Sequence, residues 1–357
     1  MNEILNPFVA YLNRYTTVSP EHEAAFDEFI TQTPPPTGSP LRLVTKTEIF
    51  LRTCFEQSHP PSIILTGNAG DGKTYLCRQI IKAFTGQDIT EWKDQVQWTI
   101  ERDGAVLQVV KDLSEVGESA GAEILQQLAN SLLVGQPNSI FLIAANEGRL
   151  RALLGREDKL KVVGDKVNKQ LKNGLNKNDT QLIVLDLNQV TTSAYIPQVL
   201  TWLTDPSHWL ACQGCTAFEN CPIRFNATRL RDTYVSERLQ LLYQVLEHLG
   251  IHVTIRDMLI HIAYTVTGGL NCSGIVQQNR QLGTDFHQYA YFENVWGEML
   301  DEASRRRIVV AHNLQHFNVG RQSLFEVDNF IINGGSYDGQ VQAEYKRLFK
   351  ASVDLGD

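Results

Sequence analysis

The sequence predicts an α/β fold in which a parallel sheet is followed by a helical second domain. Short apolar runs alternate with segments of helical periodicity over residues 41–188, which is typical of a sheet with helices on its faces. A glycine-rich stretch stands between the first apolar run and the helix that follows it. Beyond Asn188 no strong buried strand follows directly, and Thr228–Leu249 and Ile255–Val266 are predicted helices separated at Gly250.

The individual elements follow from the spacing of apolar residues and from the turn residues between them. In chain order we predict two short helices within 1–30, a proline-rich linker over Thr31–Pro40, a helix over Thr47–Gln57, a strand over Ser62–Leu65, a helix over Leu76–Phe84, strands over Val96–Ile100 and Ala105–Val110 joined by a turn at Arg102–Gly104, a helix over Gly121–Val134, and strands over Ile140–Ala144 and Leu182–Leu185.

Composition and charge limit the class of protein and its domain count. The chain has 357 residues, of which 43 % are apolar, and this length allows a large core and more than one domain. We expect an N-terminal helical segment and linker (1–40), a core (41–205), a cysteine-bearing helical lid (206–280) and a mixed C-terminal segment (281–357). No apolar run approaches a membrane span, and residues 1–20 lack the features of a signal peptide, so we expect a cytoplasmic protein. With a formal net charge of −8, nucleic-acid binding would require a local basic patch.

The glycine-rich stretch is the most specific motif. Thr66–Thr74 reads Thr-Gly-Asn-Ala-Gly-Asp-Gly-Lys-Thr and matches the phosphate-binding pattern G-x-x-x-x-G-K-S/T between a strand and a helix. The pattern predicts ATP binding, with Lys73 on the β- and γ-phosphates and the Thr74 hydroxyl on Mg²⁺. The residues expected to bind the nucleotide are Gly67, Asn68, Ala69, Gly70, Asp71, Gly72, Lys73, Thr74 and Tyr75.

Two carboxylates are candidates for supporting the magnesium ion, which calls for an acidic residue at the end of a strand beside the strand of the loop. Asp112 and Asp186 each follow a predicted strand. We favour Asp112, because the next strand then ends at Asn146, where an amide could orient the attacking water. The residue that activates this water would be Glu115 or Glu147, or would be missing.

These motifs, with the Ile-Ala-Ala-Asn-Glu-Gly run at Ile143–Gly148 and the helical domain, resemble the core of an AAA+ ATPase over Leu41–Gly269. Within that group, the loop sequence and the later Cys-x-x-Cys…Cys-Pro are similar to ATPases of bacterial phage defence, of the DptF type that acts in phosphorothioation-dependent DNA restriction. The resemblance implies a nucleotide-driven component of a multi-subunit restriction complex. Arg256 lies where such proteins have a lid arginine near the γ-phosphate, and the alternative is a surface salt bridge with the adjacent Asp257.

The sequence departs from the AAA+ pattern at two places. Leu113 follows Asp112, so the usual Asp-Glu pair is absent, and Lys172–Gln181 contains no arginine where a finger for the neighbouring subunit is expected. A homo-oligomer is possible but is not indicated by such a finger. Three interpretations stay open: an ATPase, a nucleotide-loaded switch that binds protein partners with little hydrolysis, and a metal-stabilised scaffold.

A cysteine cluster predicts a metal site. Cys212, Cys215 and Cys221-Pro222 have chelating spacing, with Cys272 as the first candidate for a fourth ligand and His208 as the second. We expect Zn²⁺ ahead of an iron–sulfur cluster, and the remaining alternative is a set of buried free thiols. Cys54 and Cys77 fit the core of helices instead.

A basic stretch follows Asn146. Nine basic residues lie between Arg149 and Lys177, against only Glu157, Asp158 and Asp165. The stretch is a candidate surface for DNA or for an acidic partner, or it is a solvated helix face. It contains no interleaved aromatic residues, so stacking on single-stranded bases is not indicated.

Overall fold

A computed structural model of the chain describes residues 5–20, 22, 33–87, 95–135, 139–156, 158–175, 179, 181–282 and 287–317. By its internal contacts the chain divides into two compact units, Met1–His312 and Asn313–Asp357. Since 313–317 are the only described residues of the second unit, the account below concerns the first. The second predicted N-terminal helix, Lys177 and most of the predicted C-terminal segment lie outside the described residues.

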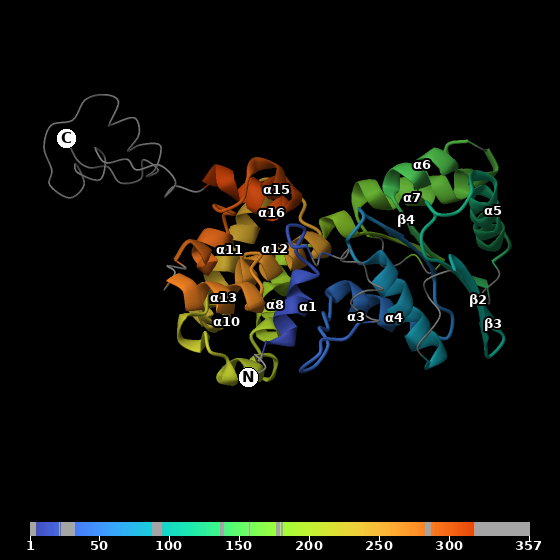
Figure 1. Ribbon diagram of the computed structural model, residues 1–357. Helices are drawn as coiled ribbons and strands as arrows, with labels where there is room; N and C mark the ends of the chain where they lie inside the picture. Colours follow the sequence, from blue (N-terminus) through green and yellow to red (C-terminus); the bar gives the residue numbers. More distant parts are fainter. Residues whose placement is uncertain are drawn as a thin grey trace, which may run out of the picture. The chain divides into compact units, whose positions relative to one another are not determined.

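A five-stranded sheet forms the centre of the α/β part (Figure 1). Its strands are β1 (Ser62–Thr66), β2 (Gln97–Arg102), β3 (Ala105–Val110), β4 (Ser139–Ala145) and β5 (Leu182–Asp186), in the order β2-β3-β4-β1-β5. Strands β3, β4, β1 and β5 are parallel, and the register pairs Thr66 with Ala145 on one side and with Asp186 on the other. All five residues of β1 are buried, which explains its continuous apolar sequence.

Strand β2 is the exception to the predicted parallel sheet. It pairs antiparallel with β3, with Arg102 opposite Ala105. The two residues between them, Asp103 (φ 51°) and Gly104 (φ 82°), form the tight turn that sequence analysis placed here. A two-residue connection can only reverse the chain, because a parallel pairing needs a long crossover.

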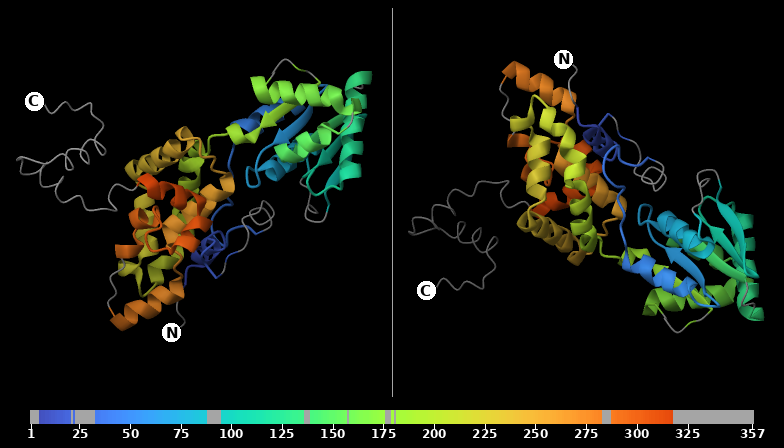
Figure 2. Two further views of the ribbon diagram at one scale, coloured as in Figure 1. Left: turned by 90° about the horizontal axis from the view of Figure 1, so that it is seen from above. Right: turned by 90° about the horizontal axis from the view of Figure 1, so that it is seen from below.

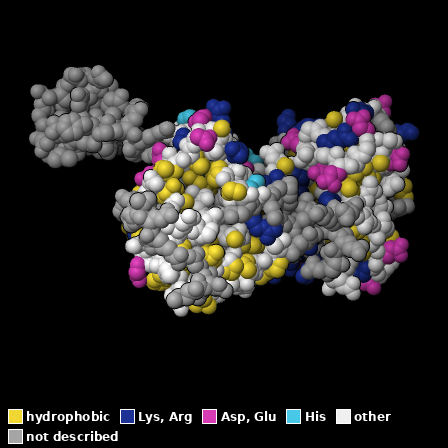
Figure 3. Space-filling model, viewed as in Figure 1, with side chains coloured by type: hydrophobic (Ala, Val, Ile, Leu, Met, Phe, Trp, Pro, Cys, Tyr) yellow, Lys and Arg dark blue, Asp and Glu magenta, His cyan; other side chains and the backbone are white. Residues whose placement is uncertain are grey.

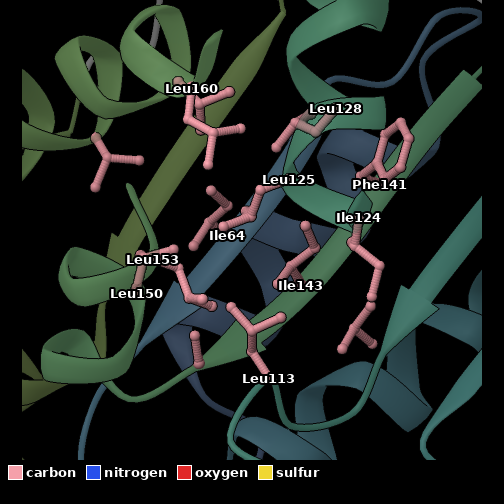
Figure 4. Packing of buried hydrophobic residues seen from close by; sticks show 14 of the residues in the cluster. Ile64, Leu113, Ile124, Leu125, Leu128, Phe141, Ile143, Leu150, Leu153 and Leu160 are labelled. Carbon is pink, nitrogen blue, oxygen red and sulfur yellow. The ribbon is translucent and has the colours of Figure 1, made fainter. Parts of the chain in front are cut away.

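Helices cover both faces of the sheet, as Figures 1 and 2 show. They are α3 (Lys46–Phe55), α4 (Lys73–Thr85), α5 (Glu118–Val134), α6 (Glu147–Leu154), η1 (Asp158–Leu160) and α7 (Lys161–Asn173). Helices α3 and α4 pack with one face of the strands, and α5, α6 and α7 pack with the other. On the second face, Leu125, Leu128 and Leu150 are fully buried against Ile64 and Ile143 (Figure 4). Cys54 and Cys77 lie in the first core, as predicted.

The other secondary-structure elements of the first unit are all helices, as the sequence predicted for the second domain, and they extend into the segments 204–226 and 281–312, which were expected to be a loop and a mixed segment. The elements are α1 (Pro7–Asn13), η2 (Leu187–Gln189), η3 (Thr192–Tyr195), α8 (Ile196–Leu203), α9 (Pro206–Trp209), η4 (Leu210–Gly214), η5 (Phe218–Asn220), α10 (Pro222–Leu230), α11 (Thr233–His248), α12 (Ile255–Thr267), α13 (Cys272–Leu282), η6 (His287–Tyr289), α14 (Tyr291–Asn294) and α15 (Glu302–Arg307), followed by α16 (Val309–Leu314) and η7 (Gln315–Phe317) at the boundary of the second unit.

Helix α12 is the core helix of this helical part. Every residue from Met258 to Thr267 is buried, and α1, α10 and α14 pack against it. Among the described residues, Ile255–Gln278 is the one segment long and apolar enough to cross a membrane, and most of its apolar window is buried inside the structure. The helix predicted over Thr228–Leu249 is wrong in one respect: α10 ends at Leu230, and the Asp232 side chain then caps α11 by accepting from Tyr234 N.

The N-terminal segment packs into the helical part. The Phe8 ring of α1 stacks on His208 of α9, with 3.9 Å between ring centroids. The proline-rich linker also has tertiary contacts, since the Trp202 indole N–H donates to the Ser39 carbonyl at 2.7 Å. These contacts hold residues remote in sequence together around α8 and α9.

Candidate functional site

The glycine-rich loop, Gly67–Thr74, connects β1 to α4 at the carboxyl edge of the parallel strands. Gly67, Gly70 and Gly72 have φ values of 152°, 99° and 82°, which side-chain-bearing residues rarely adopt. A Cβ atom on Gly70 would lie 2.9 Å from Thr254 Oγ1 and 3.0 Å from Arg256 Cβ. Glycine is therefore required at position 70 both by backbone conformation and by the close approach of α12.

Lys73 is the first residue of α4, and its side chain bonds back to the start of the loop. Its Nζ donates to the Gly67 and Asn68 carbonyls at 2.9 and 2.8 Å and to Asn146 Oδ1 at 3.2 Å. Burial lowers the pKa of Lys73, and the negative charges of Asp112 and Asp71 oppose this shift. These bonds hold the Lys73 ammonium group near the start of α4. The first turn of this helix has no side-chain cap, because Gly72 occupies the N-cap position.

Asn146 links the loop to the end of β3. It is the N-cap of α6, and its side chain makes no cap bond there. Instead Nδ2 donates to Ser114 Oγ at 3.2 Å, while Ser114 N donates to Asp112 Oδ1 at 2.7 Å. The carboxyl ends of β1, β4 and β3 therefore bring Lys73, Asn146 and Asp112 close to one another.

The expected strand order is wrong in one detail. Strand β4 separates β3 from β1, so Asp112 does not end a strand beside the loop's strand, whereas Asp186 does. The Asp186 carboxylate, however, caps η2 by accepting from Asn188 N and Gln189 Nε2, each at 3.1 Å. Asp112 is also the carboxylate whose charge acts most strongly on the pKa of Lys73. Asp112 is therefore the carboxylate that interacts with Lys73, although it lies one strand further away than Asp186.

Both glutamates considered for water activation are in ion pairs. Glu147 accepts from Arg151 at 2.7 Å, and Glu115 lies 3.8 Å from Lys111. Tyr75, which the sequence assigned to nucleotide binding, donates its hydroxyl to Glu48 of α3 at 3.3 Å. The hydroxyl of Tyr75 therefore supports the packing of α4 on α3.

Residues just before and at the start of α12 also contact the loop. Of these residues, the sequence analysis had assigned only Arg256 to the site. Asp71 Oδ2 accepts from Asn68 N at 2.5 Å, and its Oδ1 lies 2.7 Å from His252 Nε2. The Arg256 backbone N–H donates to the Gly70 carbonyl at 3.3 Å. Burial raises the pKa of Asp71, and the His252 contact opposes this rise. The Thr254–Asp257 capping box marks the start of α12 in the sequence, but no local pattern identifies His252.

The four cysteines predicted as metal ligands come together. Cys212, Cys215, Cys221 and Cys272 all line one cavity of about 20 Å³. His208 does not line it and stacks on Phe8 instead. Within the described ranges, however, no group of three or more His, Cys, Asp or Glu side chains is placed so that it could hold a metal ion, so the structure gives no support to the predicted metal site.

The basic stretch is partly neutralised by ion pairs. Arg149 and Arg156 both pair with Glu118, Arg151 pairs with Glu147, and Lys166 lies 2.6 Å from Asp179. Figure 3 shows basic side chains over α6 and α7 with acidic ones among them. Four exposed lysines have no ion-pair partner among the residues that the structure describes: Lys159, Lys161, Lys169 and Lys172.

Fold and site define an α/β protein with a mostly parallel five-stranded sheet, a glycine-rich loop at its carboxyl edge and a helical part that reaches this loop. Comparison with known proteins adds no family: no protein-family model matches the chain, and no curated protein sequence gives a significant match.

Proposed function

We propose that the chain binds ATP with Mg²⁺ at the Gly67–Thr74 loop and hydrolyses it. The observation that carries this proposal is the position of Lys73, whose Nζ is held by Gly67 O, Asn68 O and Asn146 Oδ1 where three parallel strands end. These oxygens hold the lysine in place, and a phosphate would replace some of them as its partner. Ligands of open α/β sheets bind at this edge, and the start of α4 supplies backbone N–H groups for an anion.

Each residue then has a separate role. Lys73 neutralises charge on the β- and γ-phosphates, and Thr74 coordinates Mg²⁺. Asp112 supports the ion, Asn146 orients the attacking water, and Arg256 approaches the phosphates from α12. Glu147 and Glu115 are the candidates for activating water, and either one would first leave its ion pair. This requirement supports slow turnover, so a nucleotide-loaded switch is the second candidate function.

The resemblance to phage-defence ATPases supports a place in a DNA-directed restriction complex with other subunits. In that setting the exposed lysines of α7 and η1 would contact DNA backbone or an acidic partner protein. Nucleotide state would reach the helical part through the direct contacts of Asp71 with His252 and of Gly70 with Arg256.

The lysine tests binding. We expect Lys73→Ala to weaken ATP binding at least about 100-fold by calorimetry, since the cation and its charge-assisted hydrogen bonds are removed. Lys82→Ala, an exposed lysine on the same helix, is the matched control and should bind normally. Near-normal ATP affinity in Lys73→Ala would exclude the loop as the nucleotide site.

The two aspartates test hydrolysis. Steady-state phosphate release with Mg²⁺ should disappear in Asp112→Asn and persist in Asp186→Asn, because Asp186 is used as a local cap. The reverse result would assign the ion to Asp186. Tight ATP binding in the wild-type chain with no phosphate release, with or without DNA, would establish the switch.

A further inference from the structure

Asn146 occupies the N-cap position of α6, yet its side chain does not cap the helix. Asparagine at an N-cap usually bonds with its side-chain oxygen to a backbone N–H group of the first turn. Here Oδ1 accepts from Lys73 Nζ instead, and Nδ2 donates to Ser114 Oγ, each at 3.2 Å. The Asn146 side chain is therefore turned away from its own helix and toward the glycine-rich loop.

Hydrogen-bond chemistry fixes which end of this amide faces the loop. The Lys73 ammonium group is a donor only, so the Asn146 atom that contacts it must be the acceptor Oδ1. The Nδ2 group then needs an acceptor of its own, and the Ser114 hydroxyl oxygen supplies one. The orientation of Asn146 thus depends on Ser114 as well as on Lys73.

Ser114 is itself held in place by the backbone around it. Its N–H donates to Asp112 Oδ1 at 2.7 Å, and the neighbouring Leu113 N–H donates to the Ala144 carbonyl of β4 at 2.8 Å. The Leu113 side chain is fully buried in the core on this face of the sheet (Figure 4). The turn after β3 is therefore anchored to β4, and it presents the exposed Ser114 hydroxyl to Asn146.

We propose that Ser114 is a positioning residue that keeps the Asn146 side chain on the nucleotide site and prevents it from capping α6. The inference rests on the proposed function, because it concerns the amide that we expect to orient the attacking water. With Nδ2 engaged by Ser114, the atom that Asn146 presents to the site is the acceptor Oδ1. Once a phosphate has replaced Asn146 as a partner of Lys73, Oδ1 accepts a hydrogen bond from the water and directs a lone pair of the water oxygen toward the γ-phosphate.

Loss of the serine hydroxyl should affect the helix and the site in opposite directions. Without an acceptor for Nδ2, the Asn146 side chain can rotate and bond its oxygen to an N–H group in the first turn of α6. The helix then gains a cap, while the site loses its acceptor. Removing a serine that only stabilised the fold would weaken the structure instead.

Hydrogen exchange tests the positioning in the absence of nucleotide. In the full chain with Ser114→Ala, amide exchange at Gly148 and Arg149 should slow roughly fivefold, because the new cap bond protects the second and third N–H groups of α6. Ser114→Thr retains a hydroxyl and should exchange like the wild type. Ser119→Ala, at an exposed serine of α5, is the matched control and should also leave the exchange unchanged. Unaltered or faster exchange in Ser114→Ala would overturn the proposal.

Steady-state ATP hydrolysis tests the consequence for the site. Ser114→Ala should lower kcat about tenfold, while the ATP affinity measured by calorimetry stays within about twofold of the wild type, since the acceptor faces water and not phosphate. The effect should vanish in the Asn146→Ala background, because Ser114 acts through that side chain. The same loss of kcat in both backgrounds would contradict the positioning role. A wild-type chain that does not bind or hydrolyse ATP would refute the proposed function, and the exchange measurement would still decide the role of Ser114.

Discussion

Asp71 is the residue through which the glycine-rich loop contacts the helical part. One carboxylate oxygen accepts from Asn68 N within the loop, and the other lies 2.7 Å from His252 Nε2. Since Asp71 is buried, its charged form depends on both contacts. His252 therefore positions the loop without belonging to it.

His252→Ala should weaken ATP binding by up to about tenfold, because Asp71 loses the partner that fixes it from the side of the helical part. Calorimetry at fixed pH and Mg²⁺ measures this change. His248→Ala removes an exposed histidine of α11 and serves as the control with unchanged affinity. Equal affinities in both variants would show that the Asp71–His252 contact does not shape the nucleotide site.

Helix α7 illustrates how an element divides its surface between core and solvent. Val163, Gly164, Val167 and Gln170 are buried, and the Gln170 side chain bonds the backbone of β5 through Leu182 O and Val184 N at 2.8 and 3.0 Å. On the exposed face, Lys161, Lys169 and Lys172 follow the helical period. The buried face anchors α7 to the sheet, so the lysines are presented on a rigid support.

Reversing Lys161, Lys169 and Lys172 together to Glu should lower affinity for double-stranded DNA at least about tenfold at low salt and reduce the salt slope by about 0.9 for each phosphate that is no longer neutralised. Lys166 is left in place because Asp179 already neutralises it. Reversal of the exposed Arg229, Arg231 and Arg238, which lie in α10, at its C-cap and in α11, makes the same charge change and controls for net charge. Unchanged DNA affinity and slope in the α7 variant would remove DNA as its partner.

A buried histidine in the helical part makes the free energy of unfolding of the first unit depend on pH. His261 of α12 is fully buried, with Nδ1 2.7 Å from the Tyr243 hydroxyl and Nε2 3.0 Å from the Val295 carbonyl. These contacts fit a neutral ring that accepts from Tyr243 and donates to Val295. Burial lowers the pKa of His261 from 6.5 to about 4.

Because this pKa is depressed in the folded chain, the stabilisation is complete above pH 6.5 and is lost as pH falls toward 4. From this side chain alone we expect the free energy of unfolding to be about 2 kcal/mol smaller at pH 5 than at pH 8. Urea unfolding at both pH values measures the difference. His261→Gln should reduce it, and His248→Gln should not. An unaltered pH dependence in His261→Gln would show that the destabilisation has another source.

The sequence by itself determined the local features of this protein. Continuous apolar runs such as Ser62–Leu65 predicted buried parallel strands, Asp103-Gly104 predicted a tight turn, and the glycine pattern predicted a loop between strand and helix. These features depend on the backbone preferences and the apolar spacing of residues that are close together in the chain, so the local sequence is enough to predict them. Cys272 was also predicted to join the other three cysteines, because of its residue type and despite its distance along the chain, and it lines the same cavity.

Only the tertiary structure decided which distant residues meet and at what spacing. It placed β4 between β1 and β3, which no local pattern encodes because strand order depends on how whole layers pack. It set His252 against Asp71, 181 residues apart, and it directed the Tyr75 hydroxyl to Glu48. It also brought Cys212, Cys215, Cys221 and Cys272 to the lining of one cavity. Residue types name the chemistry that is available, and packing between remote elements fixes the geometry in which that chemistry is used.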